Sequence, residues 1–280
     1  MDDALIASLG LAQKPGGWNL NLIMAALAKY GTPKASPTIK AILETQQQPC
    51  QPELMAYFVR VDPAYADRIF RSAPWDMQKA PSSCTVQYFQ RTAPLAMHPV
   101  LENYMAAYLM HSDVFLKTTA ARMLGRYGGA TAQAPLWETF RYFHNYWKGK
   151  GTELASNGEG VMLEVEIRNA IARGRNWLAT ENDLHTLESL CTSERCRADV
   201  ANDLRAWQQP LRIEITDQPD GATVAQYYGL NIAALEVKLR QFPKGTEFLL
   251  NARGTSAIAD AARIRAFAAS QGLFIAPEKQ

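Results

Sequence analysis

The clearest hydrophobic pattern in the chain lies in residues 112–147 and predicts two helices joined by a glycine turn. Apolar residues recur there at the spacing of one helix face. Ser112 and Asp113 carry side-chain oxygens that can cap a helix start, and Gly128 can end that helix because glycine enters the left-handed region freely. A second helix begins near Pro135, whose missing N–H is not needed in a first turn.

The same periodicity continues on both sides of this stretch and predicts a mainly helical chain as far as residue 208. We expect a short helical piece in 1–17 and further helices over 19–30, 36–43, 52–59, 63–73, 82–89, 99–111, 161–179, 181–190 and 194–208. Within the helix 161–179, Glu164 and Arg168 are four residues apart, the spacing that supports an exposed ion pair. Such a succession of helices favours a helical array.

At Pro210 the hydrophobic pattern changes from helical to alternating. Strands are predicted over 211–216, 224–228, 246–251 and 273–276, with helices over 232–242 and 256–270 between them. Strands that are separated by helices pair in parallel through right-handed crossovers. The pattern therefore predicts two domains, a helical domain over 1–209 and a small α/β domain over 210–280.

Two segments of the helical part echo each other. The stretch Leu27-Ala28-Lys29-Tyr30-Gly31 matches Leu124-Gly125-Arg126-Tyr127-Gly128, at an offset of 97 residues (124 minus 27), and each is followed by a short turn and a helix. This offset leaves room for about two intervening units of roughly 40–47 residues. An internal echo of this kind is the sequence signature of a repeat protein.

The pattern Ala120-Ala121-x-x-Leu124-Gly125-x-x-Gly128 resembles a HEAT-type helical repeat. The resemblance implies a mainly α fold, an α-α superhelix of the HEAT type, followed here by the small α/β unit with its short parallel sheet. It also implies a style of binding, because stacked repeats present a long concave face to a protein or peptide. It implies no reaction, so we expect a non-enzymatic interaction or assembly scaffold.

Charge and hydropathy exclude several classes of partner. The chain has 29 basic and 27 acidic residues and a net charge of +2, so it lacks the excess of positive charge that is typical of proteins that bind nucleic acid or an anionic membrane. No apolar run reaches the roughly 18 residues that a membrane-spanning helix needs. A DNA-binding helical repeat, as in some HEAT-like glycosylases, would need a basic stripe along its concave face.

An unusually aromatic segment, 135–148, is the candidate partner-binding surface. Its rings fall on several faces of the predicted helix, which favours either core packing between repeats or an aromatic ledge that faces a partner. The candidate residues are Trp137, Arg141, Tyr142, Tyr146 and Lys148. The loop-like segment 148–160 that follows holds four glycines but does not match a phosphate-binding loop, so it is also a candidate for partner contact.

The four cysteines leave two alternatives open. Cys50 pairs with Cys84 and Cys191 with Cys196 in an oxidising compartment, periplasmic or secreted, or all four are buried thiols of a cytoplasmic protein. The first alternative is slightly favoured. The first residues have no basic segment and no cleavage site, so we do not expect a signal peptide there.

No constellation of residues predicts a catalytic, metal or cofactor site. The four histidines (His98, His111, His144 and His185) lack metal-ligand spacing with one another or with cysteine, and no nucleophile-elbow motif is present. The alternative function is an enzyme or small-ligand binder whose site lies at the seam between the two domains. It would use the turn 253–256, where a strand leads into a helix N-terminus that can hold an anion.

Overall fold

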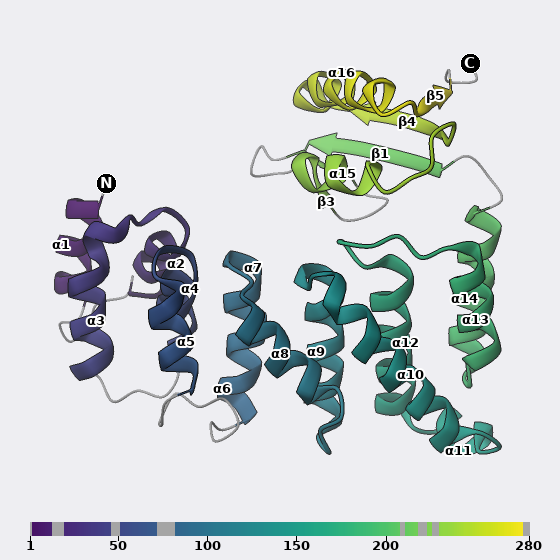
Figure 1. Cartoon of the computed structure of the whole chain (residues 1–280), viewed down its shortest axis with the longest axis horizontal. Helices are drawn as coiled ribbons and strands as arrows, with labels where there is room; N and C mark the ends of the chain where they lie inside the picture. The colour runs from purple at the N-terminus through teal and green to yellow at the C-terminus, as the bar shows by residue number, and fades with distance from the viewer. Residues whose placement is uncertain are drawn as a thin grey trace. The chain divides into compact units, whose positions relative to one another are not determined.

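The computed structural model describes residues 2–12, 20–45, 51–71, 82–207, 211–217, 223–225 and 230–276 (Figure 1). The described chain is mainly helical and carries one small sheet, as the hydrophobic pattern predicts. It divides into two compact units, Met1–Tyr127 and Gly128–Gln280. The second unit contains both the last helices before Leu211 and the sheet, so the change from helix to strand at the predicted position falls inside it.

The first unit consists of helices alone in its described part. Their bounds are α1 Asp2–Ala12, α2 Leu20–Tyr30, η1 Pro33–Ala35, α3 Ser36–Thr45, α4 Pro52–Val61, α5 Pro63–Arg71, α6 Ser82–Gln87, η2 Tyr88–Thr92, α7 Ala93–Leu95, α8 Pro99–Tyr108 and α9 Val114–Tyr127. Helix α2 packs on α4, and α8 packs on α9. Helix α4 is the centre of this unit, because its residues 54–58 are fully buried on every side of the helix.

The turn after α2 is fixed by side chains from distant positions. The Arg60 guanidinium donates to the carbonyl oxygens of Leu27, Ala28 (2.9 Å) and Gly31 at the end of α2, where carbonyl groups run out of helical donors. The Tyr57 hydroxyl donates to the Thr32 carbonyl at 2.6 Å. The C-terminus of α2 is therefore capped by α4, the helix it packs against.

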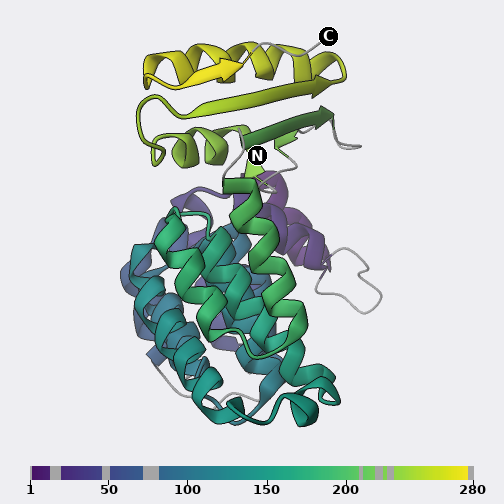
Figure 2. The ribbon, with the colours of Figure 1, turned by 90° about the vertical axis from the view of Figure 1, so that its right-hand side faces the viewer.

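The second unit begins with helices and ends with a sheet. Its elements are η3 Ala130–Ala132, α10 Gln133–Trp147, α11 Gly151–Ala155, α12 Gly158–Arg173, α13 Glu181–Leu190, α14 Glu194–Trp207, β1 Leu211–Asp217, β2 Thr223–Ala225, β3 Leu230–Asn231, α15 Ile232–Leu239, β4 Glu247–Arg253, α16 Thr255–Ser270 and β5 Phe274–Ala276. Helix α12 packs on α10 and α14, and α13 lies beside α14 (Figures 1 and 2).

The predicted helix 161–179 is too long, because α12 ends at Arg173. Gly174 follows, and the chain folds back so that the Trp177 indole N–H donates to the Ile171 carbonyl at 2.9 Å. The Trp177 ring occupies the space that a Cβ at residue 174 would need. The close approach of the ring therefore requires glycine at this position, and residues 174–180 form a loop.

The sheet has the strand order β3-β2-β1-β4-β5. Strands β1, β4 and β5 run in parallel, with Ile213 beside Leu250 in the register, and this confirms the predicted parallel pairing. Strands β2 and β3 add an antiparallel edge that the pattern did not predict as such. Figure 2 shows β1 and β4 side by side.

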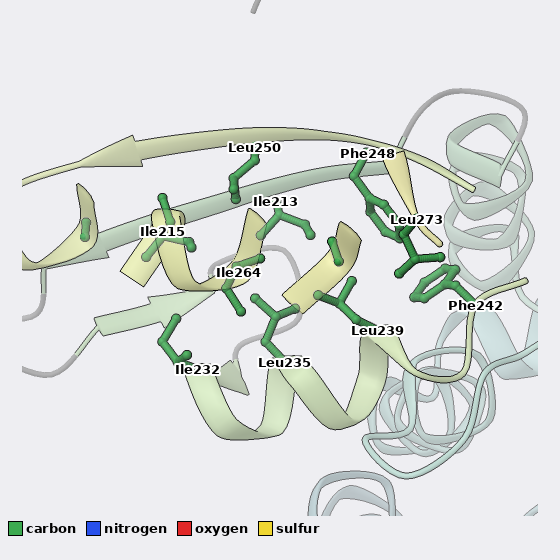
Figure 3. Packing of buried hydrophobic residues seen from close by; sticks show 13 residues of the cluster. Ile213, Ile215, Ile232, Leu235, Leu239, Phe242, Phe248, Leu250, Ile264 and Leu273 are labelled. Carbon is green, nitrogen blue, oxygen red and sulfur yellow. The ribbon is translucent and has the colours of Figure 1, made fainter. Parts of the chain in front are cut away.

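One face of the sheet is covered by both helices. Ile213 and Ile215 of β1 and Phe248 and Leu250 of β4 share that face, and they form one buried cluster with the residues of α15 and α16 that point at them (Figure 3). The cluster members from the helices include Ile232, Leu235, Leu239 and Ile264. The opposite face carries the intervening residues of β1 and β4, which are half-buried or exposed.

The two echoed segments form the same succession of elements. Helix α2 ends at Tyr30 and is followed by η1 at Pro33 and α3 at Ser36; helix α9 ends at Tyr127 and is followed by η3 at Ala130 and α10 at Gln133. Every boundary on the C-terminal side is thus shifted by the 97 residues of the sequence echo (127 minus 30, 130 minus 33 and 133 minus 36).

Candidate functional site

Helix α10 separates its aromatic residues between a buried and an exposed face. Phe140 and Phe143 are buried together with Leu136 and Thr139, and this face packs on α12. Tyr142 and Tyr146, one turn apart on the other face, are each 54% exposed. Core packing, one of the two predictions for this segment, therefore holds for the phenylalanines, whereas the tyrosines are exposed to solvent.

The predicted binding residues lie outside the buried face of α10, with Trp137 and Arg141 along one line of the helix, Tyr142 and Tyr146 along the neighbouring line, and Lys148 at the helix end. We define the α10 surface as Trp137, Arg141, Tyr142, Tyr146, Lys148 and Lys150; Trp137 is half-buried and the other five are exposed. The sequence prediction contained all of these except Lys150. Lys150 lies beyond the end of α10 at Trp147, so helical spacing does not predict its position, and only the fold places its ammonium over the Tyr146 ring.

Two cations of the α10 surface stack on aromatic rings. The Arg141 guanidinium lies 5.5 Å from the centroid of the Trp137 ring, and the Lys150 ammonium lies 4.5 Å from the centroid of the Tyr146 ring. The Tyr146 ring in turn meets the Trp147 ring edge-on at 5.1 Å. These contacts restrict the long side chains before any partner arrives, which lowers the entropic cost of using them in an interface.

The cations of the α10 surface have no carboxylate partner in the described part of the chain. Arg141, Lys148 and Lys150 form none of its ion pairs, whereas Lys34, Lys40, Arg91 and Arg263 each pair with an acidic side chain. Helix α10 itself contains a single acidic residue, Glu138. The surface therefore combines exposed aromatic area with uncompensated positive charge.

The loop between α13 and α14 contains the predicted disulfide. Cys191 and Cys196 are bonded, with their Cα atoms 5.5 Å apart, and both side chains are buried. The Ser193 hydroxyl accepts from the Cys196 N–H at 3.1 Å and so caps the start of α14. The other predicted pair stays a prediction, because Cys84 is buried in α6 but Cys50 lies outside the described residues.

The prediction of an exposed pair between Glu164 and Arg168 is wrong. Both side chains are buried, and each faces a different part of the α13–α14 hairpin. The Glu164 carboxylate accepts from the backbone N–H groups of Thr192 and Ser193. Apolar and buried residues are spread over several faces of α12 between residues 163 and 171. Its buried charged side chains must therefore form hydrogen bonds or ion pairs within the protein.

Arg168 lies in an ion-pair network between α12 and α14. Its guanidinium donates to Asp203 at 2.7 Å and to Asp199 at 2.8 Å, and Arg173 at the end of α12 also contacts Asp203. Burial lowers the pKa of Arg168, an effect that the two carboxylates oppose. The Arg168 side chain is only 2% exposed, so the network links the packed surfaces of α12 and α14 and is not open to solvent at its centre.

The turn proposed as an anion site binds a carboxylate of the chain itself. Asp217, the last residue of β1, accepts from the Ser256 hydroxyl at 2.8 Å and from the Ala257 N–H at 2.8 Å, at the N-terminus of α16. These hydrogen bonds lower the pKa of Asp217. Gly254 before the helix has a φ of 114° and leaves room for that carboxylate, which a side chain would not.

The loop 174–180 contacts the sheet part through a buried lysine. Lys238 of α15 is 1% exposed, and its ammonium donates to the carbonyl oxygens of Gly174 (2.7 Å) and Trp177. Leu178 packs against the buried cluster of the sheet. Burial lowers the pKa of Lys238 to about 8. This junction is thus occupied by the chain's own hydrogen bonds and an aliphatic side chain.

The pKa of Lys238 predicts a rise in stability with pH. The unfolded chain holds this proton up to about pH 10.5 and the folded chain only up to about pH 8, so unfolding takes up a proton between these values. The free energy of unfolding should therefore rise between these pH values, by at most about 3 kcal/mol. We expect this rise in wild type and its absence in Lys238→Met, measured by urea denaturation at a series of pH values.

The quantity to compare is the difference in the free energy of unfolding between wild type and Lys238→Met at each pH. Burial raises the pKa of Tyr57 to about 12, so the stability that this tyrosine contributes is lost as the pH rises above about 10. That loss is common to wild type and variant and cancels in the difference. A pH-independent difference would show that Lys238 titrates in the folded chain as it does in the unfolded one.

Three histidines form hydrogen bonds with backbone groups. His98 caps α8 by accepting from the Val100 N–H at 3.2 Å, His111 accepts from the Asp113 N–H at 3.0 Å, and a ring nitrogen of His144 lies 2.8 Å from the Leu190 carbonyl. Among the described residues, no group of three or more His, Cys, Asp or Glu side chains could hold a metal ion.

Comparisons with models of protein families, with curated proteins and with solved structures find no match for this chain. In the part of the chain that the structure describes, no helix is both long enough and apolar enough to cross a membrane. The α10 surface, with its exposed tyrosines and cations, is the feature of the described chain that most resembles a binding site.

Proposed function

We propose that this protein is a non-enzymatic interaction or assembly scaffold, in which HEAT-like helix pairs stack as a solenoid and a protein partner binds on its concave face through the α10 surface. The observation that carries the proposal is the pair of exposed tyrosines, Tyr142 and Tyr146, beside cations that are held over aromatic rings. Tyrosine and arginine are enriched where protein interfaces derive most of their binding energy.

The repeat architecture is supported by the echoed turns. The same residues, Tyr followed by Gly, end α2 and α9, and a single 3₁₀ turn leads to the next helix in both cases. The packing of neighbouring helices in sequence, such as α8 on α9 and α13 on α14, is the local arrangement from which helical solenoids are built.

Site-specific photo-crosslinking tests the proposal. A benzophenone amino acid placed at Tyr146 of the full chain should capture a defined protein from the extract of the source cells, and Tyr142→Ala in the same chain should reduce that capture at least about tenfold, the loss of a typical interface anchor. The products would be identified by mass spectrometry. The matched control is Tyr30, a tyrosine of α2 that is also 54% exposed and has Lys29 over its ring at 5.1 Å.

Comparison of the two sites distinguishes specific binding from non-specific crosslinking. Capture at Tyr146 but not at Tyr30 supports the proposal, because the two tyrosines are equally exposed and each has a lysine over its ring. Equal capture at both sites, or capture at Tyr146 that Tyr142→Ala leaves unchanged, contradicts a binding surface on α10.

A further inference from the structure

We infer that the occupant of the α10 surface is an acidic segment of a partner protein, held in an extended conformation. This inference rests on the proposed function and adds the chemistry of the partner. Its basis is that three exposed cations, Arg141, Lys148 and Lys150, form no ion pair within the described part of the chain and lie beside exposed tyrosine side chains.

Positive charge is concentrated locally on the α10 surface. The whole chain is nearly neutral, but α10 and the two lysines after it contribute three exposed cations against one glutamate, Glu138. A carboxylate that approaches these cations gains attraction without breaking an existing ion pair. Rim charges of this kind speed association and select partners by sign.

The spacing of the cations defines the pattern of the segment. Arg141 and Lys148 are seven residues apart, which is about 10 Å along a helix that rises 1.5 Å per residue. An extended chain covers about 10 Å in three residues. We therefore expect two carboxylates about three positions apart, with an apolar or aromatic side chain between them that reaches sideways to the neighbouring line of Tyr142 and Tyr146.

The aromatic contacts favour a peptide over a nucleic acid. Lys150 lies over one face of the Tyr146 ring, and Trp147 packs against this ring at right angles, so a planar base that stacked on that face would have to displace the lysine. An aliphatic or aromatic side chain can pack against the exposed part of the two tyrosines without displacing the lysine. The surface therefore fits a peptide that carries both charge and apolar area.

Fluorescence anisotropy with designed peptides tests the inference on the full chain. The probes are a labelled peptide GSEFGEGS, in which two glutamates flank a phenylalanine three residues apart, and versions with glutamine or lysine in place of glutamate. At low salt the glutamate peptide should bind at least about tenfold more tightly than the glutamine peptide, as expected when charge complementarity determines the preference. High salt should reduce this preference.

Charge reversal on the protein provides the second measurement. Lys148→Glu/Lys150→Glu should abolish the preference for the glutamate peptide and create one for the lysine peptide. The control is Lys244→Glu/Arg265→Glu, which makes the same change in net charge at two exposed cations of the sheet part and should leave binding within about twofold. Circular dichroism would establish that both double variants are folded.

Three outcomes would overturn the inference. They are equal affinity for the glutamate and glutamine peptides, an equal loss in the control variant, and tighter binding of a short single-stranded oligonucleotide that displaces the peptide. If any of these occurs while Tyr146 still captures a protein, the proposed function stands and only the acidic partner is rejected. If Tyr146 captures nothing, both are rejected.

Discussion

Replacing Arg168 with alanine is expected to lower the free energy of unfolding by about 3 kcal/mol. The side chain is 2% exposed and pairs with two aspartates, so its removal takes this partner from Asp199 and leaves Asp203 with the exposed Arg173 alone. We expect the lower end of the range known for broken buried pairs, because Asp199 is 33% exposed and keeps some contact with water. Urea denaturation of the full chain measures the change.

Arg173→Ala is the matched control for this prediction. Arg173 contacts the same Asp203, but its side chain is 57% exposed, so its loss should cost less than about 1 kcal/mol. Hydrogen exchange should show faster opening of α12 and α14 in Arg168→Ala than in Arg173→Ala. Equal losses of unfolding free energy in the two variants would contradict the expectation that the buried arginine contributes more to stability than the exposed one.

Trp177→Ala should destabilise the second unit by about 3–5 kcal/mol, the range for large aromatic residues removed from a core. The indole is 5% exposed, packs against Gly174 and donates a hydrogen bond to Ile171. Its removal leaves a cavity beneath the loop 174–180 and frees the backbone that Lys238 binds. Thermal unfolding and hydrogen exchange of this loop would measure the loss.

Tyr146→Ala provides the control for the tryptophan variant. This tyrosine is 54% exposed, so its removal should change the free energy of unfolding by less than about 0.5 kcal/mol. The same measurement establishes that the α10 surface can be altered without unfolding the protein. A loss in Trp177→Ala no larger than that in Tyr146→Ala would contradict a structural role for the buried ring.

The hydrophobic pattern predicted the elements well where each rests on a local signal. Helix α9 begins at its predicted cap and strands β1, β4 and β5 follow from alternation, whereas Gly128 follows the helix without the left-handed conformation that was predicted for it. The end of α12 was missed because it depends on Trp177, which folds back onto Gly174, and no local pattern encodes that contact. Tertiary packing decided the boundary.

The candidate surface was predictable in its composition but not in its arrangement. Spacing alone placed Tyr142 and Tyr146 on one face, yet only the fold shows that Phe140 and Phe143 take the core face and leave the tyrosines exposed. The pair Glu164 and Arg168 shows the opposite error. Four-residue spacing fits an exposed pair and two separate buried contacts equally well, and the apolar neighbours on α12 were the signal that distinguishes them.

The hydrogen bonds of Lys238 have a consequence for the order of synthesis. During translation the loop that holds Gly174 and Trp177 leaves the ribosome 61 to 64 residues before the lysine that binds its carbonyl groups, whereas the cysteines of the 191–196 loop are only five residues apart. A nascent chain can therefore close its disulfide early, but it holds the loop after α12 with unpaired carbonyl groups until α15 has been made. A ribosome that stalls in this interval would present that loop to chaperones and proteases.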